Sequence, residues 1–338
     1  MRKYLLYQLK KYAWLLVVLS VVCSIPNITN AASISMYAEY KDYAGITQGY
    51  IQEPGLASLY LPLLILLFAV PILVYSFKMT KRSVDAYYAL PLKREKLYFV
   101  ATMVGLILVL VPYTVSFWSS FFTLLFREGN PYKMGYYVPA YFGGLCFGVF
   151  LYGVNAFVYT RANRAIDGII YMLFYAFVGL LIFKYVESLF TDYWGYINSS
   201  IEASFIFSGG MFEFAEKMES LIVGRERTFY YAGWWFGTAI AAGIICYALF
   251  FLLIRYEKGE SAEQNSDSWF GYKTLVPVYL AFSMGMGALE DPLGFVMVVI
   301  AGFVATVVSK RKFSKKLIDW APFAIGLGAG LVLALIGG

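Results

Sequence analysis

Few side chains in this sequence are of types that could carry catalysis or bind a metal. There is no histidine, which removes imidazole as a general base, a proton shuttle or a metal ligand. The cysteines Cys23, Cys146 and Cys246 lie in three different apolar stretches, and their spacing suits neither a zinc site nor a disulfide framework. We interpret them as buried structural thiols. The sequence therefore predicts no metal site and no catalytic residue.

Charged residues inside apolar stretches would mark an ion pathway. Lys184 and Glu187 lie three positions apart, where they can pair with each other near the end of one stretch. Asp167 and Asp319 lie at the ends of two others. These carboxylates form no continuous chain, so the sequence supports ion coupling only weakly. A phosphate-binding loop of the form G-x-x-x-x-G-K-[ST] is absent, so this chain is not expected to bind ATP through one.

The apolar content decides the class of protein. Of 338 residues, 60% are apolar and 14% are charged, and the mean hydropathy is +0.66. A water-soluble domain of this length needs more charge to cover its surface. The apolar residues come in blocks, and a helix of roughly 20 residues crosses a hydrocarbon core of about 30 Å. Because a backbone facing lipid must satisfy its own hydrogen bonds, we expect an all-α polytopic membrane protein, folded as a single transmembrane domain over 1–338.

The order of the blocks predicts the topology. About nine apolar segments are expected, eight or nine of them spans, at 13–30, 56–77, 97–126, 137–160, 168–190, 229–254, 274–289, 293–309 and 317–338. With the N-terminus inside, 20 of the 27 Lys and Arg residues fall in the inner segments 1–12, 78–96, 161–167, 255–273 and 310–316. Positive charge near span ends favours the cytoplasmic side. The N-terminus is therefore predicted to be cytoplasmic, with 1–12 as an interfacial elbow helix.

Two regions leave alternatives open. The short segments 274–289 and 293–309 begin the extra C-terminal spans of 274–338, and they form either a full hairpin or a re-entrant one. The extracellular segment 191–228 mixes apolar and acidic residues, which favours amphipathic helices on the outer membrane surface. This outer segment is either a lid packed on neighbouring spans or a gate that contacts substrate.

One inner loop, 78–96, combines several local signals. Ser83 is a candidate helix cap, and Asp85 would lie in the first turn. Val84, Tyr87 and Tyr88 share one helix face at i, i+3 and i+4. A helix is expected to stop at Leu90-Pro91, because the residue before proline avoids the α region. We predict a short amphipathic helix, either an ordinary basic loop element or a surface for a soluble partner.

The stretch Arg82–Leu97, which reads RSVDAYYALPLKREKL, resembles the loop after the second span in ABC-2 type transporter permeases, particularly those of Gram-positive multidrug and peptide exporters. Two other stretches are similar to the same family in layout. They are Glu260-Ser261-Ala262 followed by Trp269-Phe270, in a linker that is longer and more acidic than is typical, and the basic run 310–316 before the last apolar segment.

The resemblance implies a transmembrane permease subunit of a bacterial ABC exporter in the plasma membrane. Such a chain pairs with a second copy or a related permease chain, contacts membrane lipids and no nucleic acid, and is not itself an enzyme. ATP and Mg would be bound by separate ABC ATP-binding subunits. The implied coupling residues are Arg82, Ser83, Val84, Asp85, Tyr87, Tyr88, Leu90, Pro91, Lys93 and Arg94, with a secondary cytoplasmic contact at Arg161 and Arg164.

The implied substrate is amphipathic or hydrophobic, such as a peptide, an antimicrobial or a lipid. Two other functions stay open at this point. An ion-coupled secondary transporter would carry inverted repeats with broken helices, and no convincing repeat is present. A membrane-embedded lipid-modifying enzyme is less favoured, because histidine and any carboxylate cluster are lacking.

Overall fold

A computed structural model describes residues 2–34, 37–41, 47–52, 54–176, 206–224, 232–256, 262–264, 268–285, 292–310 and 317–337. The chain expected as a single transmembrane domain divides into two compact units. Unit 1 comprises 1–74, 92–154 and 208–252, and unit 2 comprises 75–91, 155–207 and 253–338.

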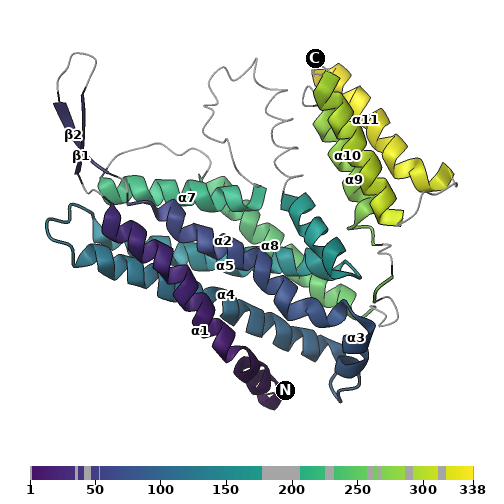
Figure 1. Cartoon of the computed structure of the whole chain (residues 1–338), viewed down its shortest axis with the longest axis horizontal. Coiled ribbons are helices and arrows are strands. Elements are labelled where there is room, and N and C mark those ends of the chain that lie inside the picture. The colour runs from purple at the N-terminus through teal and green to yellow at the C-terminus, as the bar shows by residue number, and fades with distance from the viewer. Residues whose placement is uncertain are drawn as a thin grey trace. The chain divides into compact units, whose positions relative to one another are not determined.

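Unit 1 is a helical bundle with one short hairpin (Figure 1). Its elements are α1 (Arg2–Ser33), β1 (Tyr37–Lys41), β2 (Thr47–Ile51), α2 (Leu56–Tyr75), α4 (Arg94–Leu125), η2 (Met134–Tyr136), α5 (Tyr137–Thr160), α7 (Ile206–Val223) and α8 (Ala232–Ile254). The last residues of α2, α5 and α8 and the first two residues of α7 belong to unit 2. The two strands pair antiparallel, with Tyr37 opposite Ile51. The sequence analysis did not predict this hairpin.

Aromatic rings and glycines bring the helices of unit 1 together. Tyr60 of α2 donates a hydrogen bond to the carbonyl of Ala140 in α5, at 2.7 Å. Tyr113 of α4 stacks on Tyr141 of α5, with ring centroids 5.9 Å apart. The Tyr113 ring occupies the space that a β-carbon at Gly144 would need, so glycine is required for this close approach of α4 to α5.

Polar side chains join α1 to α4 inside the bundle. The Asn27 amide donates to the Ser116 hydroxyl at 2.6 Å, and that hydroxyl donates to the Cys23 carbonyl at 2.8 Å. Arg127, just after α4, donates to the carbonyls of Ala31 and Ile34 at the end of α1. A cation at a helix C-terminus satisfies carbonyls that lack helical partners.

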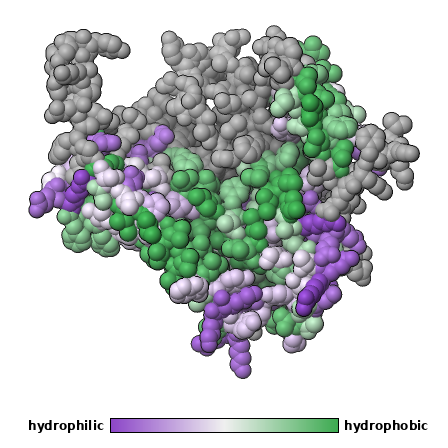
Figure 2. Space-filling model, in the orientation of Figure 1, coloured by the Kyte–Doolittle hydropathy of each residue, from purple (hydrophilic) through white to green (hydrophobic). Residues whose placement is uncertain are grey.

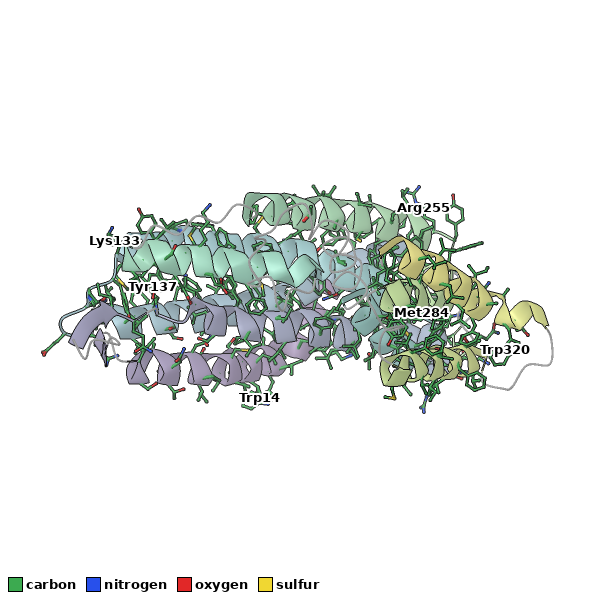
Figure 3. The ribbon with its side chains drawn as sticks, turned by 90° about the horizontal axis from the view of Figure 1, so that it is seen from above. Trp14, Lys133, Tyr137, Arg255, Met284 and Trp320 are labelled. Carbon is green, nitrogen blue, oxygen red and sulfur yellow. The ribbon has the colours of Figure 1, made fainter. Side chains whose placement is uncertain are left out.

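The outer surface of unit 1 is apolar along its middle (Figure 2). Trp14, which is 78% exposed, points away from the bundle (Figure 3). Five described helical stretches are long and apolar enough to cross a membrane: Arg2–Ser33, Ser58–Lys78, Arg94–Leu125, Met134–Thr160 and Phe236–Ile254. By length and composition, the chain is therefore an all-α membrane protein, to which the hairpin is a local addition.

Unit 2 contains short helices followed by three apolar ones. Its elements are η1 (Ser76–Lys78), α3 (Lys81–Tyr88), the end of α5, the helix Ala165–Ala176, α9 (Tyr272–Ser283), α10 (Pro292–Lys310), η6 (Leu317–Trp320) and α11 (Ala321–Gly337). Helices α9, α10 and α11 lie side by side (Figure 1). A β-carbon at Gly326 of α11 would meet the backbone of Pro277 in α9, so these two helices approach closely there.

The described residues of every predicted apolar segment are helical, except that Phe126 at the end of 97–126 is already in a turn. Residues 2–12, expected as a separate elbow helix, are instead the first turns of the unbroken helix α1. Residues 177–190, with Lys184 and Glu187, and residues 286–291, where the two short C-terminal segments are connected, lie outside the described residues. The number of spans and the side of the N-terminus stay predictions.

The outer segment 191–228 contains one described helix, α7. Phe214 of α7 packs on Phe147 of α5, with ring centroids 6.0 Å apart, and on Phe236 of α8 at 5.8 Å. The backbone N–H of Lys133 donates to the carbonyl of Ile222 near the end of α7. These contacts are those expected of a lid packed on neighbouring helices. Its predicted position at the outer membrane surface stays a prediction.

Candidate functional site: the α3 platform

Helix α3 lies within the loop that the sequence singled out, and it starts earlier than predicted. It runs from Lys81 to Tyr88, so Ser83 is its third residue, and the prediction of Ser83 as the cap is wrong. The residue at the cap position is Thr80, whose side chain makes no capping hydrogen bond. Its hydroxyl donates instead to that of Ser83, at 2.8 Å. The first turn closes with the Val84 N–H donating to the Thr80 carbonyl at 3.0 Å.

The apolar face of α3 is turned toward the protein. Val84 is 3% exposed, and the ring of Tyr87 packs on Phe77 of η1 with centroids 4.7 Å apart. Tyr88 is half-buried. The prediction that these residues share one helix face is thus confirmed for Val84 and Tyr87, and the structure turns this face inward.

The other side of α3 is exposed. Arg82 and Asp85 are exposed on the helix, and Leu90 and Pro91 are exposed just beyond its end. A partner would therefore contact the charged residues of the helix and the apolar pair Leu90-Pro91 just beyond it. Lys93 and Arg94, also predicted for the site, are exposed at the start of α4 and belong to unit 1.

A buried lysine fastens η1 to α5. Lys78 is 7% exposed, and its ammonium donates to the carbonyl of Thr160, the last residue of α5. That carbonyl is among the four at a helix end that have no partner within the helix. The positive charge also complements the negative end of the helix dipole. Only two residues separate η1 from α3. The hydrogen bond from Lys78 therefore also fixes the position of the N-terminal end of α3.

The second predicted contact, Arg161 and Arg164, lies in the turn after α5. The Arg161 guanidinium sits over the ring of Phe157, 5.4 Å from its centroid. The Arg164 Nε donates to the backbone carbonyl of Glu263, and the Glu263 N–H donates to the Asn163 carbonyl at 3.0 Å. Two hydrogen bonds therefore join this turn to Glu263 in the linker between α8 and α9. The turn donates one of them and accepts the other.

Glu263 also reaches α3. Its carboxylate Oε1 accepts a hydrogen bond from the backbone N–H of Lys81, the first residue of α3, at 3.2 Å. An anion at a helix N-terminus satisfies a free N–H and interacts favourably with the dipole. This bond supplies the cap that Ser83 does not. We call η1, α3, the turn 161–164 and residues 262–264 the α3 platform.

The far end of the same linker is attached to neighbouring helices. Phe270 packs edge-on against Phe157 with centroids 5.1 Å apart, and its carbonyl accepts a hydrogen bond from Tyr175 at 3.2 Å. Tyr272, which begins α9, donates to the buried carboxylate of Asp167 at 3.0 Å. The linker therefore connects the platform to the start of α9.

The platform has the features of a contact surface. Among the residues that the structure describes, no group of three His, Cys, Asp or Glu side chains lies together as a metal site would require. Cys23, Cys146 and Cys246 are free thiols. What the platform offers is a charged, exposed helix held by buried groups, which suits recognition of another protein.

Sequence reasoning missed three charged residues. Lys78 was counted only as a basic loop residue, and Glu263 only as part of an acidic linker. The unusual acidity of that linker was the one local signal of a special role. Glu219 of α7 is 5% exposed, although its sequence context suggested a surface position.

Comparison with known proteins adds no assignment: no family model, no curated protein and no solved structure matches this chain.

Proposed function

We propose that this chain is the transmembrane permease subunit of an ATP-driven ABC-2 type exporter, with the N-terminus in the cytoplasm of a bacterial cell. The observation that carries the proposal is the construction of α3. Its apolar side is fixed on the protein through Val84 and Tyr87, while Arg82 and Asp85 are exposed. This helix is the proposed contact with an ABC ATP-binding subunit.

To pass a movement of the partner to the membrane helices, the helix that contacts the partner must be rigid. An isolated helix of eight residues is unstable in water, because nucleation is costly. Here α3 is held at its N-terminus by Glu263, on its face by Phe77, and at its base by Lys78. A helix fixed in this way can pass a displacement of the partner to the membrane helices instead of unfolding.

The proposal assigns ATP binding and hydrolysis to a separate subunit. Its sequence has no P-loop, so ATP and Mg would be bound and hydrolysed by the partner. The chain would supply the path, together with a second copy or a related permease chain. The likeness of Arg82–Leu97 to permease loops supports the same partner.

The proposed substrate is amphipathic or hydrophobic: a peptide, an antimicrobial or a lipid. This class is the one implied by the resemblance of Arg82–Leu97 to the loops of multidrug and peptide exporters.

The test is purification of the tagged chain from its native membrane in mild detergent, followed by identification of bound proteins and assay of ATP hydrolysis. The proposal predicts an ABC ATP-binding subunit in stoichiometric amount and ATP hydrolysis by the complex. Transport into ATP-free proteoliposomes driven by an ion gradient would contradict it and favour a secondary transporter. Conversion of lipid by the isolated chain would favour an enzyme.

A further inference from the structure

Glu263 has an unusual backbone conformation. Its φ is +65°, and among the described residues it is the only one other than glycine with a positive φ. For a residue with a long side chain, the left-handed region is unfavourable because the β-carbon crowds the backbone. Such a conformation persists where the surroundings fix it, and these positions concentrate at functional sites.

Three hydrogen bonds from two other segments hold Glu263. Its N–H and its carbonyl are bonded to Asn163 and Arg164 of the turn after α5, and its carboxylate accepts from Lys81 of α3. The two backbone hydrogen bonds hold Glu263 against the turn. With its φ at +65°, the residue also has its carboxylate within hydrogen-bond distance of α3. A glycine would adopt this φ without strain, but it would have no carboxylate to reach the helix.

We propose that Glu263 is a positioning residue that fixes α3 to the turn 161–164, so that the two make one rigid docking surface. The role of that surface, binding an ATP-binding subunit, rests on the proposed function. The attachment of α3 to the turn 161–164 by Glu263 does not depend on the proposed function. Without Glu263, α3 would keep its attachments at Val84 and Lys78 but lose the bond to its first turn.

The described residues further along the linker are attached within the same compact unit. Phe270 packs on Phe157, and Tyr272, which begins α9, donates a hydrogen bond to Asp167.

The experiment is hydrogen–deuterium exchange of the purified full chain, followed over peptides covering 79–90 and 159–166. In Glu263→Ala, the amides of the first turn of α3 should exchange about fivefold faster, the effect expected from loss of a helix cap. Glu263→Gln keeps an oxygen that can accept the bond, and it should stay close to wild type. Gln264→Ala, at the exposed neighbouring position, is the matched control and should change nothing.

A second variant covers the case in which Glu263→Ala disturbs folding. Lys81→Pro removes the backbone N–H that donates to Glu263, together with the exposed lysine side chain, and proline is tolerated at the first position of a helix. Thr80 is already extended, with φ −124° and ψ 137°, as a residue before proline must be. In the Lys81→Pro background, Glu263→Ala should no longer change exchange in α3.

The outcomes separate the two proposals. Unchanged exchange in α3 for Glu263→Ala, or an equal change in the Lys81→Pro background, would overturn the positioning role and leave the proposed function standing. Faster exchange in a chain that captures no ATP-binding subunit would support the positioning role and count against the proposed function. Where both hold, Glu263→Ala should reduce ATP hydrolysis by the complex while Glu263→Gln keeps it.

Discussion

The carboxylate of Glu263 lies 3.2 Å from the backbone nitrogen of Lys81, although 182 positions separate the two residues in the chain. The bond joins the linker after α8 to the first residue of α3. It replaces a cap that the local sequence does not provide, since Thr80 makes no capping hydrogen bond. The N-terminus of α3 is therefore capped by a distant part of the chain.

The buried lysine at the base of α3 should matter for stability. Lys78→Met removes the donor to the Thr160 carbonyl and leaves that helix end less well satisfied. We expect a loss of about 1–3 kcal/mol in the free energy of unfolding, as for a broken bond to a buried charged group. Lys96→Met removes an exposed lysine of the same basic loop and should have little effect. Thermal unfolding in detergent would compare the two, and equal stabilities would contradict this role for Lys78.

Replacing either of two glycines in α11 by alanine should have clearly different effects on the free energy of unfolding. A β-carbon at Gly326 would meet Pro277 and Leu280 of α9, whereas one at Gly328 would meet nothing within 4 Å. Gly326→Ala should therefore cost about 1–3 kcal/mol through overpacking, and Gly328→Ala should be neutral or slightly stabilising because alanine favours helix. Unfolding of the two variants, followed by fluorescence in detergent, provides the measurement. A destabilised Gly328→Ala together with an unchanged Gly326→Ala would refute the close packing of α9 on α11.

The polar contact between α1 and α4 should contribute a measurable coupling. Asn27 and Ser116 are 2% and 1% exposed, and their side chains are 2.6 Å apart. Interhelical hydrogen bonds in membrane proteins contribute on average about 0.6 kcal/mol and at most about 1.7 kcal/mol. A double-mutant cycle of Asn27→Ala and Ser116→Ala should give a coupling in this range. Strictly additive effects would mean that the bond contributes nothing beyond packing.

Much of the helical layout could be predicted because it depends on local patterns. Long apolar blocks predict the helices, and the i, i+3 spacing of Val84 and Tyr87 predicts that they share one face of α3. A separate elbow helix was predicted over 1–12, but no proline or glycine interrupts α1 before Pro26, so residues 2–12 continue without a break into the rest of that helix. The hairpin β1–β2 was missed, although Tyr, Thr and Ile are common in strands.

The site was less predictable for a physical reason. Residues 82–91 and the turn with Arg161 and Arg164 were identified separately, and the sequence holds no sign that Glu263 connects them. A hydrogen bond across 182 positions depends on how the chain folds, and no periodicity reports it. Likewise, whether Lys78 is exposed or buried depends on where the end of α5 lies.

The central claim is that the exposed face of α3 binds an ATP-binding subunit and couples its ATP hydrolysis to the membrane helices. It is tested most directly by measuring ATP hydrolysis in the complex purified from native membranes, for wild type and for the double variant Arg82→Glu, Asp85→Lys. Both residues are exposed, so the variant should remain folded. The account predicts that the partner is lost, or that its ATP hydrolysis falls at least tenfold, while Lys96→Glu keeps both. Full binding and full ATP hydrolysis in the double variant would contradict it.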